Sequence, residues 1–107
     1  MADSQLRKGA LELVVLVQLE ARPTYGGALL ARLAELGLDI SSGTLYPMLT
    51  RLKKAQHVAS HWEESPSGPP RKVYTVTARG RRQLRTLARD WRALSTVVDA
   101  QLEGIDS

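Results

Sequence analysis

Apolar side chains recur at helical spacing near the middle of the chain, and the pattern is clearest over residues 41–55. One stripe of an amphipathic helix, at positions i, i+3, i+4 and i+7, is formed by Leu45, Met48, Leu49 and Leu52. The remaining circumference has hydroxyls, a tyrosine ring and three cations but no acidic side chain. We therefore expect one side of this helix to be buried and the other to present hydrogen-bonding and positive groups.

Two more helices are expected before this one. Residues 5–21 have no helix breaker after Gly9 and are apolar nearly all round in their second half, so we expect a helix that packs on its own domain and on a second subunit. Thr24 is expected to cap a helix over 25–36, and Gly37 to end that helix in the left-handed conformation. Two short helices joined by such a turn form a helix-turn-helix, whose second helix reads DNA.

A β-hairpin is predicted next. Residues 57–64 alternate in the manner of a strand, residues 71–76 are β-branched and aromatic, and the SPSGPP segment at 65–70 is expected to be a six-residue tip. Trp62 is expected to pack beneath the hairpin. A hairpin directly after a helix-turn-helix is the wing of a winged helix.

The last helix is expected to run from residue 78 to about 103, with Thr77 as its cap and Gly104 past its end. Its apolar residues keep the 3-4 spacing of a coiled-coil seam. A helix of this length extends roughly 40 Å, which is more than a small core requires. We therefore treat 78–105 as a dimerisation segment that packs partly on a partner helix.

The chain is expected to be one domain over 1–107, with a DNA-binding core at 5–77 that includes the wing at 57–76. The expected fold class is mainly α with a β-hairpin (α+β), a winged helix-turn-helix in the order helix, helix, helix, strand, strand, helix. No apolar run reaches transmembrane length and the first eight residues are polar, so we expect a cytoplasmic protein.

Charge and composition limit the candidate chemistry. The net charge of +4, with eleven arginines and four lysines, fits an acidic partner such as nucleic acid. The absence of cysteine excludes thiolate metal sites and thiol nucleophiles, and no catalytic arrangement is visible, so we expect neither an enzyme nor a cofactor. His57, His61 and Glu63 could share a strand face, but no further ligand completes a metal site and solvated side chains are the better interpretation.

Duplex DNA suits the polar face of the 41–55 helix. The major groove admits a helix, hydroxyls and tyrosine reach phosphates or base edges, and Lys and Arg neutralise phosphates. The alternative is a winged helix that serves as a protein-interaction or oligomerisation module without sequence-specific DNA binding. Such a module should expose apolar residues on this face, whereas this helix has Ser, Thr, Tyr, Arg and Lys there.

Three segments together resemble the PadR family of transcriptional regulators, in its short subfamily. They are Thr24-Tyr25-Gly26, the run SGTLYPML at 42–49 followed by Arg51-Leu52, and the block GPPRKVYTVTARGRRQL at 68–84. The resemblance extends over about 6–102. One departure is Gln56, which stands where members of the family usually have glycine.

The resemblance implies a homodimeric repressor that binds a pseudo-palindromic operator through the third helix and the wing. Carried over position by position, the implied DNA contacts are Tyr25, Ser41, Ser42, Thr44, Tyr46, Pro47, Arg51, Lys54, Arg71 and Lys72. The arginines at 79, 81 and 82 follow the wing; either they reach phosphates or they form a solvated face.

The first and last helices are the implied dimerisation elements. The expected interface consists of Leu11, Val15, Leu84, Leu87, Trp91, Leu94 and Val98. Trp91 has two interpretations, a packing residue of the dimer core or a platform for a flat hydrophobic effector. In the second interpretation the pocket also includes Leu87, Ser95, Glu12 and Leu16, and the acid would favour cationic aromatic ligands.

Overall fold

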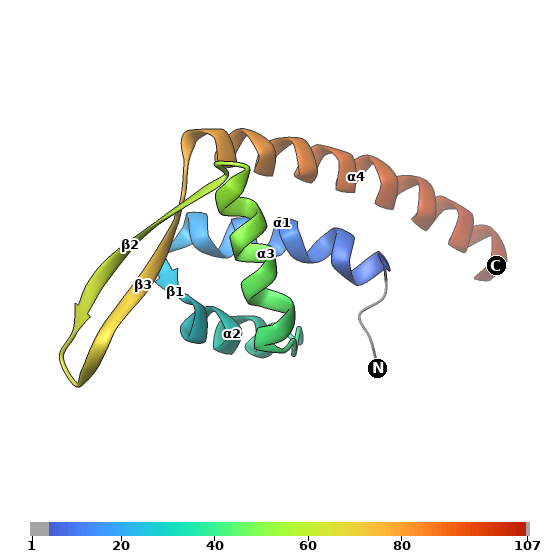
Figure 1. The fold of residues 1–107 in the computed structure, drawn as a ribbon. Helices are drawn as coiled ribbons and strands as arrows, with labels where there is room; N and C mark the ends of the chain where they lie inside the picture. The colour runs from blue at the N-terminus through green and yellow to red at the C-terminus, as the bar shows by residue number, and fades with distance from the viewer. Residues whose placement is uncertain (1–4, 107) are drawn as a thin grey trace.

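The computed structural model describes residues 5–106, and within that range four helices and a small antiparallel sheet follow the expected order (Figure 1). The fold class predicted from the sequence is confirmed, with one short strand added between the first two helices. The elements are α1 (Gln5–Ala21), β1 (Thr24–Tyr25), α2 (Gly26–Glu35), α3 (Ser42–Lys54), β2 (Val58–Ser65), β3 (Gly68–Val76) and α4 (Ala78–Asp106).

The core lies where α1, α2 and α3 meet the inner ends of the wing strands. The apolar stripe of α3 is buried as predicted: Leu45, Met48, Leu49 and Leu52. Leu11 and Val15 of α1 are buried in the same core, with 3% and 0% of their surfaces exposed. The prediction that these two face a second subunit is therefore wrong, because α1 turns them toward its own domain.

Arg32 of α2 completes the C-terminal end of α1, which has no basic residue in its last turn. Its Nη1 donates to the carbonyl oxygens of Gln18 at 3.4 Å and Arg22 at 3.0 Å. The Gln18 carbonyl also accepts from the Arg22 amide at 3.1 Å, so Arg32 places an additional, cationic donor at the negative end of the helix. Partial burial, and secondly the charge of Arg22, lower the pKa of the Arg32 guanidinium.

The turn between α2 and α3 is the one predicted from Gly37. This glycine has φ +88°, and the amides of Gly37 and Leu38 donate to the carbonyls of Ala34 and Leu33 at 2.9 and 2.8 Å. That pair of bonds is the Schellman motif, in which a left-handed residue satisfies the last carbonyls of a helix. It sets the direction in which α3 departs.

The strand β1 was not expected, and it corrects the assignment of Thr24. Thr24 and Tyr25 pair with Tyr74 and Val73 of β3, which makes β3 the central strand in the order β1-β3-β2. Thr24 is buried in this sheet, and Tyr25, not Thr24, occupies the N-cap position of α2 without a side-chain bond to the helix. A two-residue strand has too little periodicity for a pattern to reveal it.

The wing is longer and its turn tighter than predicted. β2 and β3 continue to the pair Ser65 and Gly68, with an irregularity between Glu63 and Ser65, so the expected six-residue tip is wrong and residues 66–67 form the turn. Pro69 and Pro70 fit in β3 because there it has β2 on one side and no strand on the other. Trp62 is 68% exposed and not packed beneath the hairpin, since the wing projects beyond the core (Figure 1).

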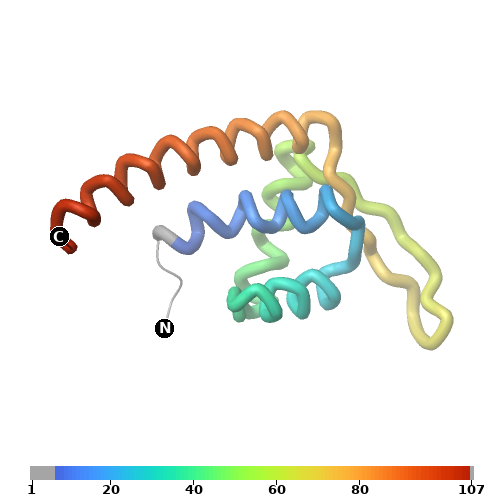
Figure 2. The backbone as a smooth tube through the Cα atoms, turned by 180° about the vertical axis from the view of Figure 1, so that it is seen from behind, coloured from blue at the N-terminus to red at the C-terminus, as the bar shows by residue number. Residues whose placement is uncertain are grey.

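Thr77 caps the last helix, as predicted. The Thr77 hydroxyl accepts from the Gly80 amide at 2.9 Å, a regular N-cap bond, and donates to the Gln56 carbonyl at 2.6 Å. From there α4 runs beside α1 and continues away from the core (Figure 2). Gly104 lies inside the helix and not past its end, since a single exposed glycine weakens a helix without breaking it.

None of the helices in the described range is both long enough and apolar enough to span a membrane.

Candidate nucleic-acid interface

The polar face of α3 is open to solvent. Most of the predicted contacts on this element are exposed: Ser41, Ser42, Tyr46, Pro47, Arg51 and Lys54. Thr44 is half-buried, and its Oγ1 lies 3.3 Å from Ser41 Oγ in the first turn. α3 continues through Pro47. The result is a helix that is buried on one side and presents hydroxyls, a phenol and cations on the other.

A second group of predicted contacts meets the first in one pocket. Tyr25 from β1, Tyr46 from α3, and Arg71 with Lys72 from β3 line it together. The Arg71 guanidinium carbon lies 4.4 Å from the centroid of the Tyr25 ring, a cation–π contact that holds the arginine over the ring. Tyr46 thus joins the polar face of α3 to the middle of the wing strand β3.

Two residues of this pocket were missed by sequence reasoning. Gly26 lies directly against the Tyr46 side chain, so that a Cβ atom there would overlap the phenol ring. Tyr74 is buried, with 7% of its surface exposed, and also lines the pocket. Burial, with a smaller contribution from Tyr46, raises the pKa of the Tyr74 phenol. The Thr-Tyr-Gly segment could have indicated the glycine, but nothing in the sequence places Tyr74 beside it.

Arg51 forms an ion pair with α1. Its Nη2 lies 3.1 Å from Oε1 of Glu12, and the exposed fractions of the two side chains are 62% and 22%. The structure therefore brings together a predicted DNA contact and a residue predicted to line an effector pocket. Glu12 faces α3, not the cavity beside Trp91.

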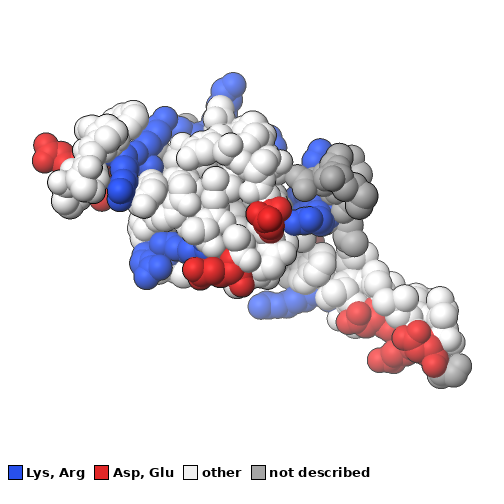
Figure 3. All heavy atoms as spheres, turned by 90° about the horizontal axis from the view of Figure 1, so that it is seen from below, with Lys and Arg blue, Asp and Glu red and all other residues white. Residues whose placement is uncertain are grey.

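Charge is distributed unevenly over the molecule. Figure 3 shows basic and acidic side chains together over the body and wing, whereas the far end of α4 shows only acidic ones. In sequence terms, residues 79–92 of α4 include six arginines and one aspartate, whereas the acids of residues 93–106 are Asp99, Glu103 and Asp106, with no Lys or Arg. The cations thus lie in the half of α4 that is nearer to the wing.

On the wing, Nε2 of His61 lies 2.7 Å from Oε2 of Glu63, and both side chains are more than half exposed. Lys72 Nζ lies 5.9 Å from the centroid of the exposed Trp62 ring. The side chains described here contain no group of three or more potential metal ligands.

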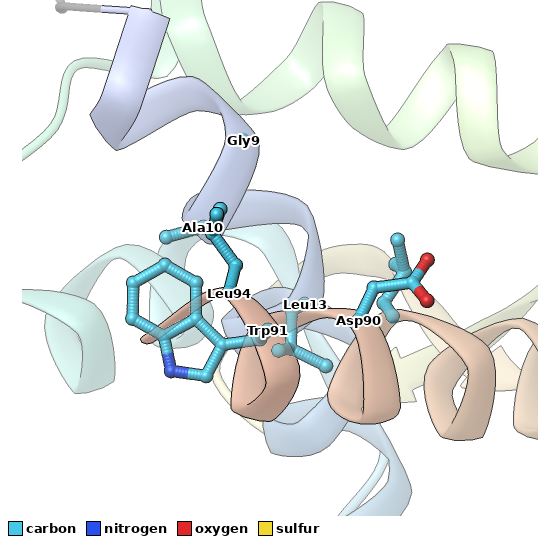
Figure 4. Close-up of a pocket in the computed structure, with 7 residues that line it drawn as sticks. Gly9, Ala10, Leu13, Asp90, Trp91 and Leu94 are labelled. Carbon is cyan, nitrogen blue, oxygen red and sulfur yellow. The ribbon is translucent and has the colours of Figure 1, made fainter. Parts of the chain in front are cut away.

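A second, apolar cavity of about 290 Å³ opens between α1 and α4, and Figure 4 shows Asp90, Trp91 and Leu94 opposite α1. Its lining residues are Gly9, Ala10, Leu13, Leu87, Asp90, Trp91 and Leu94. Of the residues predicted for an effector pocket, Trp91 and Leu87 line this cavity. Leu16 is fully buried in the core and Ser95 donates to the Arg92 carbonyl at 3.2 Å, so neither is among the lining residues.

The remaining residues of the predicted dimer interface are on α4. Leu84 and Leu87 are half-buried against the core, whereas Trp91, Leu94 and Val98 are 43%, 57% and 44% exposed. The same helix also exposes Val97, Leu102 and Ile105, and α1 exposes Val17. The apolar surface without a partner in the protomer therefore lies mainly beyond residue 90.

The architecture and the sequence have known counterparts. Residues 15–86 match the model of the transcriptional regulator PadR-like family. A PadR family transcriptional regulator from Eggerthella lenta DSM 2243 is 41% identical, with 92% of this chain and 87% of that chain covered and a TM-score of 0.84. A PadR-like transcriptional regulator from Bacillus cereus strain ATCC 14579 is 34% identical, with 92% and 97% covered and a TM-score of 0.85. A Streptococcus transcriptional regulator is 34% identical, with 98% and 100% covered and a TM-score of 0.82.

The family match includes α3, most of the core and the wing, and the similar structures also cover most of the last helix. Regulators of this family are DNA-binding proteins and not enzymes. The chain therefore belongs to the PadR-like family of transcriptional regulators.

Proposed function

We propose that the protein binds a pseudo-palindromic operator as a homodimer and represses transcription there. The observation that carries the proposal is one continuous polar surface, in which Tyr46 links the exposed face of α3 to Arg71 and Lys72 midway along the wing. Within this surface α3 is the element for the major groove, and the wing cations are suited to the flanking phosphates.

The dimer is supported by the surface of α4. Its outer half exposes an apolar row that has no partner in the protomer: Leu94, Val97, Val98, Leu102 and Ile105. Its charges are also separated, with arginines in the inner half and acids in the outer half. Two copies of α4 packed antiparallel would bury the apolar rows and bring each acidic end against the partner's basic half. A parallel pair would place like charges together.

The presence of two α3 helices in one dimer determines the form of the operator. A two-fold axis between protomers places the two α3 helices in successive major grooves, with half-site centres about 34 Å apart, which is one turn of B-DNA. Each half-site alone is held by few contacts, so tight binding requires both at once.

The test is selection of duplexes from a random library, followed by affinity measurements over a salt series on the selected and on unselected duplexes. We expect a palindromic consensus, with affinity that falls steeply as salt increases. Tyr46→Ala and Arg51→Ala should each weaken binding to the consensus about tenfold or more, as the loss of one good contact does. Thr96→Ala, an exposed change on the side of α4 opposite the apolar row, is the matched control.

Unchanged affinity in both site variants would remove Tyr46 and Arg51 from the predicted contacts, whereas failure to enrich any sequence would contradict operator binding. In that case the interaction-module interpretation gains weight. Against it, Tyr46 is the one α3 residue among the large exposed hydrophobics of the described chain, so α3 offers little apolar surface to a protein partner.

A second proposal concerns release from DNA by a flat hydrophobic effector. It is supported by the cavity between α1 and α4, which is apolar apart from Asp90 and has the half-exposed Trp91 ring on one side. A cavity of this size and lining suits part of a planar aromatic ligand, and the carboxylate favours a cationic one.

The effector proposal can be tested by fluorescence, because Trp62→Phe leaves Trp91 as the sole tryptophan. Planar aromatic cations should quench Trp91, and Asp90→Asn should weaken this effect more for cations than for neutral analogues of the same ring. Unchanged Trp91 fluorescence across such a panel would contradict the effector proposal and leave Trp91 as a packing residue.

A further inference from the structure

The ion pair between Arg51 and Glu12 joins the DNA-reading helix to α1. Arg51 is 62% exposed on the open face of α3, and its Nη2 donates to Glu12 Oε1 at 3.1 Å. Glu12 is 22% exposed, so most of its side chain is covered by the protein, and its carboxylate lies beside the exposed guanidinium of Arg51. A carboxylate in this position will face the phosphates of any duplex that α3 approaches.

The guanidinium of Arg51 retains most of its hydrogen-bonding capacity in this pair. One nitrogen is bonded to Glu12, whereas an arginine has five N–H donors arranged as a fork. Arg51 also borders an open groove lined by Lys8, Thr44 and Pro47, which leaves space for the side chain to turn toward DNA. The guanidinium can therefore stay with Glu12 or add new bonds from its free edge.

The two kinds of DNA differ in what they offer Arg51. On non-specific DNA, Arg51 can only exchange the Glu12 carboxylate for a phosphate, which is also an anion. The exchange therefore contributes little to the free energy of binding. The carboxylate also repels that phosphate. When α3 lies in the major groove of its operator half-site, the Arg51 guanidinium can bond to a base edge or to a fixed phosphate in addition to Glu12.

We propose that Glu12 is a specificity-determining residue, which suppresses non-specific phosphate binding by Arg51 while leaving that arginine free to contact the operator. Glu12 acts through Arg51 and is not a DNA contact of its own. The idea rests on the proposed operator binding, and it assigns to an acid of α1 the repulsive element that separates correct from incorrect DNA.

The experiment compares Glu12→Gln with the unmodified protein on a random duplex and on the selected consensus, each over a salt series. Neutralising Glu12 should release Arg51 for one additional phosphate contact. The log–log salt slope on random DNA should then steepen by about 0.9, and the affinity for random DNA at low salt should increase several-fold. Affinity for the consensus should change less, so that the ratio of the two falls.

A matched control exists on the same helix. Glu20→Gln makes the same change of charge on α1, but Glu20 lies 3.8 Å from Arg81 of α4 and not beside α3. We expect Glu20→Gln to leave the salt slope unchanged. In an Arg51→Ala background, Glu12→Gln should also leave the salt slope unchanged, because no arginine remains to be released for a phosphate contact.

Three results would overturn the proposal: a slope in Glu12→Gln equal to that of the unmodified protein, the same slope change in Glu20→Gln, or a slope change that persists without Arg51. The random-duplex measurements need no operator. If selection yields no consensus, operator binding fails while the slopes still decide whether Glu12 restrains Arg51.

Discussion

Gln56 is the one residue other than glycine with a positive φ in the described chain, at +63°. It ends α3 as a glycine would: its amide donates to the Lys53 carbonyl at 3.0 Å, and the His57 amide to that of Leu52 at 2.9 Å. The Thr77 hydroxyl then holds the Gln56 carbonyl. The family resemblance expects glycine here, and the backbone keeps the glycine conformation although the side chain has changed.

Replacing Gln56 by glycine should therefore stabilise the protein. A side chain in the left-handed region costs about 1–2 kcal/mol, part of which is offset by the greater freedom of glycine in the unfolded state. We expect a net gain of about 0.5–1 kcal/mol in the free energy of unfolding, measured by urea denaturation. Gln101→Gly, inside α4, should have the opposite sign. Equal destabilisation by both changes would contradict this account of the turn.

Tyr74 should make stability fall at alkaline pH. Its pKa is raised in the folded protein, so the unfolded chain loses this proton first, and the folded state binds more protons in the interval between the two values. The contribution is complete below the ordinary tyrosine value of about 10 and is lost as pH rises through the folded value.

Urea denaturation at a series of pH values from about 9 upward tests this. Tyr74→Phe should flatten the alkaline fall, whereas Tyr25→Phe, in the same pocket but less buried, provides a hydroxyl-loss control. A fall of equal steepness in Tyr74→Phe and the unmodified protein would rule out Tyr74 as its source.

The positions of the site residues were predictable to the extent that they lie on one helix or one strand. Periodicity separated the buried side of α3 from its polar side, and the exposed positions agree. Contacts between elements were not predictable: Gly26 against Tyr46, Tyr74 in the same pocket, and Glu12 paired with Arg51 across 39 positions of sequence. Helical spacing says which face a residue occupies, but not which element lies opposite.

At the scale of elements, helices were predicted closely and the sheet was not. The caps at Gly37 and Thr77 have local chemical signatures that the structure bears out. The wing turn was misplaced because proline and glycine usually mark loops, whereas an edge-like stretch of β3 accommodates Pro69 and Pro70. Leu11 and Val15 were misassigned because α1 is apolar on several sides, and a pattern of that kind does not reveal which side faces the domain.

The element that most clearly lacks a partner is the outer part of α4. Leu94→Asp should disrupt dimers, because it places a charge in the apolar row that we propose to be buried between copies. We expect sedimentation to detect a protomer that is folded by circular dichroism. Leu36→Asp, at an exposed leucine that caps the C-terminal end of α2, should leave the association unchanged. Equal association of both variants would remove α4 from the interface.

For the whole molecule, the proposed dimer makes DNA binding depend on distance and phase. Inserting about 5 base pairs between the half-sites of the consensus turns them by half a helical turn, so that only one α3 can be seated. We expect a loss of affinity of at least about 100-fold, since the second half-site no longer contributes.

The control for this measurement is a duplex of the original length in which the central base pairs are replaced by others. Unchanged affinity for the lengthened duplex would mean that the two α3 helices are not rigidly connected, or that a single protomer is sufficient for binding.

The close approach at Gly80 has a mechanical consequence. A Cβ atom there would overlap the carbonyl oxygen of His57, so the start of α4 is pressed against the junction of α3 and β2 without an intervening side chain. The helix that begins there has 29 residues, about 43 Å in length. It works as a lever with its fulcrum beside the DNA-reading helix. A tilt of about 5° at Gly80 moves the far end by about 3 Å. Conversely, a displacement of several ångströms at the far end rotates the start of α4, beside α3, by only a few degrees.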